Sequence, residues 1–216
     1  MSNWLSTQIA RLRFRASIIR PWEDTEFTRV LREGRNRLDP QRNFVLQQFL
    51  RYALPLTGDV AEFGVYKGGT AWLLAQSMTD SGKGLHLYDT FAGSPAGTKH
   101  DFADRKVFYR DANLDSIRER FKPYPFTVFH PGLLPGTLSS AQFDRLCFAH
   151  FHLNLYQSTR QTLAAIHARM TSGGVILIED YGIKQCAGVR RAVDEFCEGQ
   201  DLKLVYLPTC QGVIIV

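Results

Sequence analysis

The chain has no long hydrophobic run, only four cysteines and no recognisable leader. No apolar stretch approaches the roughly 20 residues that a membrane-spanning helix requires, so we expect no transmembrane segment. The opening residues MSNWLSTQIARLRFR contain no apolar core followed by a small-residue cleavage site, and we therefore expect no signal peptide. The cysteines form no C-x-x-C pair and have no scaffold spacing, which predicts a reduced, cytoplasmic protein.

Lysine is absent from the most basic part of the chain. The formal net charge is +5, and ten arginines lie between Arg11 and Arg51 with no lysine among them. Nucleic-acid-binding modules interleave such charges with aromatic residues on a groove or sheet. No motif of that kind is present, which argues against a nucleic-acid partner. We interpret the arginines as part of a solvated arm that faces a partner or attracts a substrate, with a membrane surface or nucleic acid as the alternatives.

The N-terminal quarter of the chain lacks the alternation of polar and apolar residues that is typical of strands. Prolines divide it into short segments, and RNFVLQQFLRYAL predicts an amphipathic helix. The predicted apolar face of this helix contains Phe44, Val45, Gln48, Phe49 and Tyr52. With 216 residues and 44% hydrophobic content, we predict a helical arm at residues 1–55 and one main domain at residues 56–216.

The main domain alternates short apolar segments with helical ones. We expect strands at 58–65, 83–91, 124–132, 145–153, 174–181, 202–209 and 212–216, and helices within 68–82, 114–121, 157–170 and 188–199. Ser116 with Glu119, and Ser158 with Gln161, fit capping boxes at the starts of two of these helices. Helical crossovers join parallel strands, whereas the last two strands are too close for a crossover. The pattern predicts a Rossmann-like, doubly wound α/β sheet of about seven strands, mostly parallel, with an antiparallel C-terminal hairpin.

A glycine-rich turn follows the first predicted strand in VAEFGVYKGGTAW. Glu62, Gly64, Gly68 and Gly69 lie in or beside this turn, which leads into a helix. Glycines permit a tight turn and a close backbone approach, and the helix start offers free N–H groups. The dinucleotide fingerprint G-x-G-x-x-G and the P-loop spacing are both absent, which argues against a pyrophosphate or nucleoside triphosphate site.

An acidic residue ends the second predicted strand, in LHLYDTF. Asp89 lies about 20 residues beyond the glycine turn, where a carboxylate can accept hydrogen bonds from both hydroxyls of a ribose. A ligand of such a sheet lies outside the carboxyl ends of the strands, at the point where the strand order reverses. His150, His152 and Asn154 alternate along the end of the fourth predicted strand, so we expect them to border the same site.

A parallel sheet closed by an antiparallel hairpin is the arrangement expected of the S-adenosylmethionine-dependent methyltransferase fold. Five segments resemble the macrocin O-methyltransferase (TylF) family: GDVAEFGVYKGGTAW, LYDTFAGSP, PGLLPGTL, FHLNLYQSTRQTLAAIHARMTSGGVILIEDYG and RRAVDEF. The resemblance implies methyl transfer from S-adenosylmethionine to a hydroxyl of a sugar or glycoside, in a natural-product or surface-polysaccharide pathway. The cofactor contacts that it implies are Glu62, Gly64, Tyr66, Lys67, Gly68, Gly69, Thr70, Asp89, Thr90 and Ser94.

The chain departs from the family pattern at the expected metal and base. The family resembles D-x-D-L-Y-x-S-T after the fourth strand and D-D-Y after the fifth, which implies a divalent cation, usually magnesium, and an aspartate base. This chain has His152 and Asn154 in the first motif, and Glu179 and Asp180 in the second. A site of His152, Glu179 and Asp180 suits manganese, iron, zinc or cobalt better than magnesium, because imidazole is a borderline nitrogen ligand.

Removal of the acceptor proton requires a group other than Asn154, because an amide cannot accept a proton at neutral pH. His150 and His152 are the candidate replacements, since imidazole titrates near neutrality. If His152 binds metal, His150 is the remaining candidate, although His150 could instead hydrogen-bond a neighbouring strand or loop. A metal ion alone could also acidify a coordinated hydroxyl.

Other functions remain compatible with the sequence. A methyltransferase-like module that binds the cofactor without turnover would explain the loss of both aspartates at His152 and Asn154. A metal-dependent hydrolase would use the predicted metal ligands but would need neither Asp89 nor the glycine turn. We expect the arm and the loop at 92–106 to line the acceptor pocket, and the sequence is also compatible with a homo-oligomer.

Overall fold

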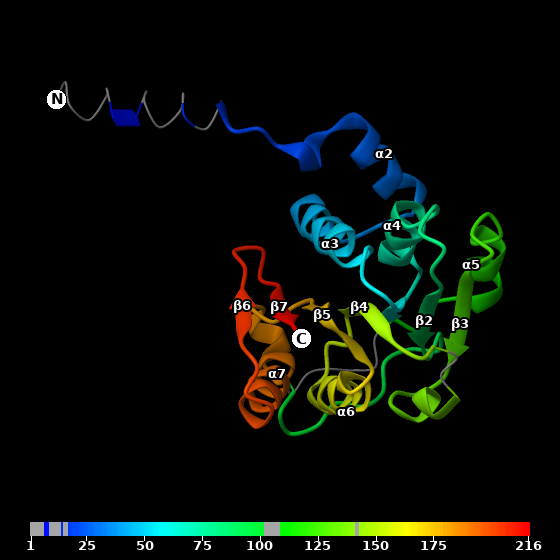
Figure 1. Ribbon diagram of the computed structural model, residues 1–216, viewed down its shortest axis with the longest axis vertical. Helices are drawn as coiled ribbons and strands as arrows, with labels where there is room; N and C mark the ends of the chain where they lie inside the picture. The colour runs from blue at the N-terminus through cyan, green and yellow to red at the C-terminus, as the bar shows by residue number, and fades with distance from the viewer. Residues whose placement is uncertain (1–6, 9–13, 15–16, 102–108, 141–142) are drawn as a thin grey trace.

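The computed structural model describes residues 7–8, 14, 17–101, 109–140 and 143–216 (Figure 1). Most of the opening segment used above, and the part of the predicted 92–106 loop beyond residue 101, therefore lie outside the described residues. The strands are β1 (Asp59–Phe63), β2 (Leu85–Asp89), β3 (Thr127–Pro131), β4 (Leu146–Phe151), β5 (Met170–Ile178), β6 (Leu204–Tyr206) and β7 (Gly212–Ile215). The helices are α2 (Thr25–Glu33), α3 (Pro40–Ala53), α4 (Gly69–Ser77), α5 (Leu114–Arg120), α6 (Tyr156–His167) and α7 (Ala187–Gly199), with short 3₁₀ turns η1 (Pro21–Glu23), η2 (Gly136–Ser140) and η3 (Lys184–Cys186).

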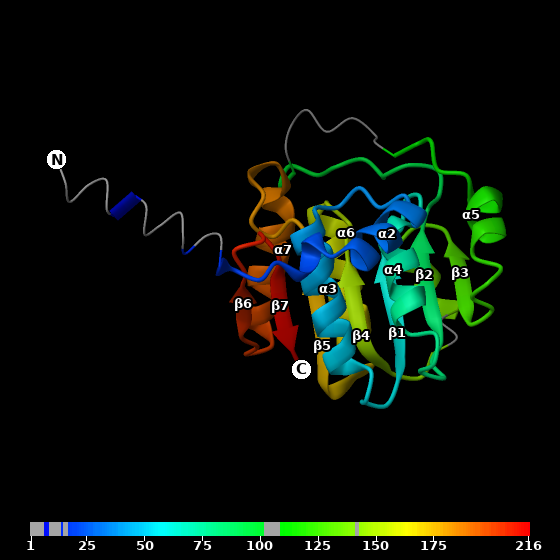
Figure 2. The ribbon, with the colours of Figure 1, turned by 90° about the horizontal axis from the view of Figure 1, so that it is seen from above.

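The strands of the described chain form one seven-stranded sheet in the order β3-β2-β1-β4-β5-β7-β6. β1 to β5 are parallel, whereas β7 runs antiparallel to β5 and to β6. Figure 2 shows the parallel strands ending at a common edge, where the loops that follow them gather. The predicted fold class, including the antiparallel C-terminal hairpin, is confirmed.

Helices cover both faces of the sheet, which explains why the central strands are almost continuously apolar. α2, α3 and α4 lie on one face, and α6 and α7 lie on the other (Figure 1). Leu46 and Leu50 of α3 are fully buried in the same core cluster as Phe148 of β4. On the opposite face, Leu163 of α6 packs in the cluster that contains Ile176 of β5.

The predicted amphipathic helix is confirmed as α3, and its Phe44, Val45 and Phe49 pack against the core, but its most deeply buried residues differ from the predicted face. The residues of α3 that are buried are Asn43, Leu46, Leu50 and Ala53, whereas Tyr52 is 55% exposed. Phe44 points to a second contact surface, since its ring packs against Trp22 and Phe27 with centroids 6.0 Å apart in each pair. The helix is covered on two sides, so its apolar residues do not form the single stripe that periodicity assumes.

Both predicted capping boxes are also wrong, because each helix begins before the predicted serine. The side chain of Asn113 caps α5 by accepting a hydrogen bond from the N–H of Ser116 at 2.8 Å. α6 begins at Tyr156, whose N–H donates to the carboxylate of Asp101 at 2.8 Å. The cap of α6 therefore comes from a loop 55 residues earlier in the chain.

Across the described residues, no helix is long and apolar enough to cross a membrane. All four cysteines are described, and none of them forms a disulfide. The boundary predicted at residue 55 stays a prediction, although α3 shares the hydrophobic core of the sheet.

Candidate functional site

A pocket opens at the carboxyl ends of β1, β2 and β4, where the strand order reverses between β1 and β4. This is the position at which ligands of doubly wound sheets bind. The residues that line it are Arg35, Asn36, Arg37, Leu38, Gly64, Val65, Tyr66, Lys67, Gly69, Thr70, Asp89, Thr90, Gly93, Ser94, Pro95, Tyr109, Gly132, Leu133, Leu134, His152, Leu153, Asn154, Leu155 and Ser158. Eight of the ten predicted cofactor residues line the pocket, and the other two, Glu62 and Gly68, do not.

Gly64 allows the ends of β1 and β4 to approach each other closely. Its φ of +94° favours glycine, and a Cβ at this position would lie 2.8 Å from the carbonyl carbon of His152 and nearer still to its oxygen. The N–H of His152 donates to the carbonyl of Phe63 at 2.8 Å. The glycine therefore positions the backbone of His152 beside the turn.

Asp89 shapes the glycine turn from the neighbouring strand. One carboxylate oxygen accepts hydrogen bonds from the backbone N–H groups of Val65 at 2.7 Å and Tyr66 at 2.8 Å. The other oxygen accepts from the N–H of Phe91 at 2.8 Å. Asp89 also lines the pocket, so the same carboxylate organises the turn and borders the space where a ribose was predicted.

The side of the pocket next to the turn is closed by a short polar cluster. The hydroxyl of Tyr66 donates to Asp111 at 2.7 Å, and Lys67 forms an ion pair with the same carboxylate. The ring of Tyr109 packs against that of Tyr66 with centroids 4.8 Å apart. On the opposite side, the hydroxyl of Thr90 donates to the carbonyl of Gly93 at 2.6 Å, which fixes the loop before Ser94.

Glu62 and Gly68 have structural positions outside the pocket wall. Glu62 is fully buried and accepts hydrogen bonds from the hydroxyl of Thr70 and from Nδ1 of His150. Gly68 is the N-cap residue of α4 at a φ of +75° and lies against the side chain of Arg120. Neither residue is placed to contact a ligand in the pocket directly.

His150 is sealed between two carboxylates. It is fully buried, with Nδ1 at 2.8 Å from Glu62 and Nε2 at 3.2 Å from Glu179. Burial disfavours the imidazolium, but the hydrogen bonds and charges of Glu179 and Glu62 outweigh burial and raise the pKa of His150 to about 9. Both ring nitrogens are engaged, so the geometry argues against His150 as the base for an acceptor.

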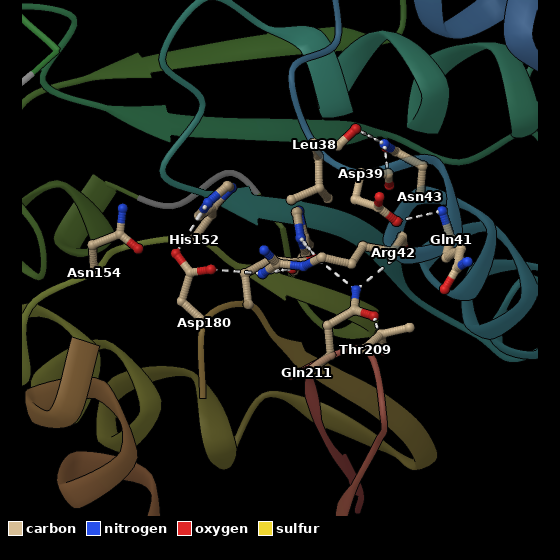
Figure 3. Close-up of polar contacts among 12 residues, drawn as sticks. Leu38, Asp39, Gln41, Arg42, Asn43, His152, Asn154, Asp180, Thr209 and Gln211 are labelled. Carbon is tan, nitrogen blue, oxygen red and sulfur yellow. Dashed lines mark hydrogen bonds and ion pairs between the residues drawn. The ribbon is translucent and has the colours of Figure 1, made fainter. Parts of the chain in front are cut away.

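Arg42 of α3 lies where the sequence predicted a metal ion. Its Nη2 forms an ion pair with Glu179. The same atom lies 2.7 Å from Asp180 (Figure 3). Gln211 donates one hydrogen bond to Glu179 at 2.7 Å and another to the backbone carbonyl of Arg42 at 3.2 Å. These contacts join α3, the end of β5 and the start of β7 around a buried pair of carboxylates.

This arrangement does not fit a divalent cation. The oxygens of Glu179 accept hydrogen bonds from Arg42, Gln211 and His150, which leaves N–H groups facing each oxygen. Burial raises the pKa of Glu179 and Asp180, but neighbouring histidines and Arg42 lower both pKa values below their ordinary range. Within the described parts of the chain, no group of three His, Cys, Asp or Glu residues is arranged to hold a metal ion.

His152 and Asn154 are the predicted catalytic residues that reach the pocket. Nε2 of His152 lies 3.5 Å from Asp180, and the imidazole is 27% exposed. Asn154 lies beyond the end of β4 at a φ of +60°, so it does not continue the strand alternation that the sequence suggested. Figure 3 shows Asn154 apart from the pair formed by His152 and Asp180.

The arm contributes to the site in two places. Residues 35–38 line the pocket, as expected for the arm, although the sequence did not single out this segment. The role of Arg42 was missed, because Arg42 was noted only as one of many arginines. Asn43, buried in α3, orders residues 35–38: it donates to the carbonyl of Leu38 at 2.9 Å and accepts from Asn36 at 2.7 Å. Asn43 was the clue in the sequence, because a polar residue inside a predicted helix requires hydrogen-bond partners if it is buried.

The strand order, with β7 antiparallel between β5 and β6, and a pocket at the ends of β1, β2 and β4 define a Rossmann-like methyltransferase fold. The solved structure of CalS11, a calicheamicin methyltransferase, has this fold: its TM-score is 0.71 over 93% of this chain and 95% of that chain, at 19% identity. The chain belongs to the macrocin O-methyltransferase (TylF) family, whose model matches residues 21–205.

Two curated relatives act on complex natural products. One is the 8-demethyl-8-(2,3-dimethoxy-alpha-L-rhamnosyl)-tetracenomycin-C 4'-O-methyltransferase of Streptomyces olivaceus, 28% identical over 82% of this chain and 70% of its own length. The other is the mycinamicin III 3''-O-methyltransferase of Micromonospora griseorubida, 29% identical over 76% of this chain and 68% of its own length.

Proposed function

We propose that the protein is an S-adenosylmethionine-dependent O-methyltransferase that acts on a hydroxyl of a sugar or glycoside. The observation that carries this proposal is that the pocket of a TylF-family chain brings the glycine turn, Asp89 and His152 to one cavity. The rhamnosyl-tetracenomycin relative supports the class of acceptor, in a natural-product or surface-polysaccharide pathway. O-methyltransferases of this fold have been solved with SAM or SAH bound, which supports the cofactor.

The pocket residues suit a nucleoside cofactor with a charged amino-acid end. Gly64 and Gly69 leave the backbone of the turn close to the ligand space, and Asp89 offers carboxylate oxygens for ribose hydroxyls. Tyr66 and Lys67, on the wall of the pocket, are proposed contacts for the cofactor carboxylate or the acceptor. When bound, S-adenosylmethionine supplies a methyl group activated by a sulfonium centre.

His152 is the proposed base for the acceptor hydroxyl. With a proton on Nε2 facing Asp180, Nδ1 of His152 is left to accept the proton of the acceptor. With the proton on His152, the acceptor oxygen would take the methyl group that bound S-adenosylmethionine supplies, and the sulfur would leave as a neutral thioether. Asn154 can orient the acceptor through its amide but cannot take the proton.

The divalent metal expected from the family pattern is not part of this proposal. Arg42 is paired with both Glu179 and Asp180, so two of the three predicted ligands are engaged by a guanidinium. We therefore derive no step that passes through a metal ion. A homo-oligomer and a cytoplasmic location remain predictions from the sequence.

Calorimetry with S-adenosylmethionine and S-adenosylhomocysteine, followed by a methyl-release assay on rhamnosyl and related glycosides, tests the proposal. We expect binding of both nucleosides and turnover on at least one glycoside, with both lost in Asp89→Ala. Asp115→Ala, whose side chain is 93% exposed on α5, is the matched control. Binding without turnover on any glycoside would favour the cofactor-binding module, and absence of nucleoside binding would reject both functions.

A further inference from the structure

A single buried cation lies between two acidic side chains that follow β5. The side chain of Arg42 is 16% exposed, and its Nη2 contacts both the fully buried Glu179 and the largely buried Asp180. The two carboxylates are adjacent in sequence but project to a common point because Asp180 adopts a φ of +59°. A guanidinium keeps its charge at any physiological pH, so this point carries a permanent positive charge.

Other groups around Glu179 also stabilise its negative charge. Gln211 donates to the same carboxylate that His150 contacts, and Gln211 is itself fully buried and held by Thr209 at 2.6 Å. Three carboxylates, Glu62, Glu179 and Asp180, therefore lie beside the basic groups of Arg42 and His150, and Asp180 also lies beside His152. A divalent ion could bind these carboxylates only by displacing the guanidinium of Arg42 from a buried, hydrogen-bonded position.

We propose that Arg42 takes the place of the divalent cation, so that the chain itself supplies the positive charge that holds Asp180 beside His152. Arg42 is a positioning residue, because it does not line the pocket and acts through Asp180. The proposal rests on the proposed function only for the role of His152. The replacement of the cation by a guanidinium rests on the contacts between α3 and the end of β5.

Manganese binding tests the replacement without any assay of turnover. Full-length protein is dialysed against EDTA and titrated with Mn²⁺, with free Mn²⁺ followed by electron paramagnetic resonance. We expect no binding by the wild type or by Arg51→Ala, which removes an exposed arginine from the same helix. Arg42→Ala leaves two carboxylates and a vacated space, so we expect it to bind Mn²⁺ at concentrations at which the wild type shows no binding.

Thermal unfolding of the wild type provides a second measurement that does not depend on the variant folding. Mn²⁺ should leave the unfolding temperature of the EDTA-treated wild type unchanged. A rise in that temperature, or tight Mn²⁺ binding by the wild type, would overturn the proposal. So would a folded Arg42→Ala protein that gains no affinity for Mn²⁺, because the carboxylates would then not constitute a latent cation site.

Kinetics separate a positioning role from a structural one. If methyl transfer is observed, we expect EDTA to leave the wild type active and Arg42→Ala to lose kcat with little change in the KM for the cofactor. Mn²⁺ should restore part of the kcat of Arg42→Ala. NaCl, which supplies only a monovalent cation, should restore none of the kcat of this variant. Failure of all glycosides to react would count against the proposed function alone, since the Mn²⁺ titrations would still decide the replacement.

Discussion

His152 joins the pocket to the buried charges behind it. Its imidazole lines the pocket, and its Nε2 faces Asp180, which Arg42 holds on the other side. The same order of contacts, from a ligand space through an imidazole to a fixed carboxylate, orients histidine bases in enzymes generally. The proposed chemistry therefore depends on two side chains that the sequence identified, His152 and Asp180, and on one support, Arg42, that only the fold brings to them.

Replacement of the proposed base tests the residue directly. His152→Gln should lower kcat by about 100-fold or more, because positioned general bases contribute rate factors of this size. The affinity for S-adenosylmethionine, measured by calorimetry, should stay close to that of the wild type. His167→Gln at the end of α6 is the control and should retain full kcat. An unchanged kcat in His152→Gln would show that another group takes the proton.

Gly64 makes a separate prediction, because its position excludes any side chain. Gly64→Ala should lower the free energy of unfolding by about 2 kcal/mol through backbone strain at positive φ and collision with His152. Urea unfolding measures this effect, and the displaced turn should also weaken nucleoside binding. Gly199→Ala, where a Cβ meets no atom within 4 Å, is the matched control and should change stability little.

At the scale of elements, long-range contacts determine how the pocket loops are fixed. Asp101 caps α6 through the N–H of Tyr156 and accepts a second hydrogen bond from the N–H of Thr98 at 2.7 Å. A single carboxylate thereby ties the loop that follows β2 to the start of the helix that follows β4. The pocket wall at Gly93–Pro95 belongs to this loop, so the cap and the wall are mechanically connected.

Removal of this cap should therefore loosen both elements. Asp101→Ala should cost about 1 kcal/mol of stability, which is typical of a lost helix cap, and should raise hydrogen exchange in the first turn of α6 and in residues 92–101. Asp115→Ala in the exposed first turn of α5 is the control. Faster exchange that is confined to α6 would contradict the connection between cap and loop.

The elements that sequence reasoning predicted well are those specified by local spacing. The strands and crossover helices of 58–199 follow from apolar segments at regular intervals, and the short connection between β6 and β7 dictates an antiparallel pair. The turn residues of the pocket were found for the same reason, since they follow β1 directly. The face of α3 and the cap of α6 were missed because each depends on a partner distant in sequence, such as Asp101.

Arg42 shows the limit of the sequence most clearly. It contacts Glu179 across 137 residues, and nothing in the local pattern of α3 distinguishes it from the other arginines of the arm. The resemblance to the family singled out Glu179 and Asp180 as a pair, but as ligands of a metal ion. The sequence could not show that the positive charge beside these two carboxylates comes from Arg42 and not from a metal ion.

At the scale of the whole molecule, two histidines oppose each other in the pH dependence of stability. Burial and the nearby His86 lower the pKa of His130 to about 4, so the folded state resists protonation that the unfolded state accepts below about pH 6.5. The raised pKa of His150, about 9, has the opposite effect: its stabilisation is complete below about pH 6.5 and is lost as the pH rises through about 9. The free energy of unfolding should therefore be greatest near pH 6.5.

Urea unfolding across this range measures both effects. Between about pH 6.5 and pH 5, the wild type should lose about 1.5 kcal/mol, because one histidine that binds a proton only in the unfolded state destabilises the fold by about this much over that interval. His130→Gln should remove this acidic decline while retaining the decline above pH 7. His167→Gln should retain both slopes, and an acidic decline that persists in His130→Gln would assign the effect to other groups.

The buried charges also bear on whether the N-terminal region opens independently of the sheet. If α3 detached alone, buried Glu179 would lose the guanidinium of Arg42, and Gln211 would lose its hydrogen bond to the backbone carbonyl of Arg42. Loss of one partner from a buried ion pair is strongly unfavourable. The amides of α3 should therefore exchange with deuterium only when the central strands open, so that the arm and the sheet behave as one cooperative folding unit.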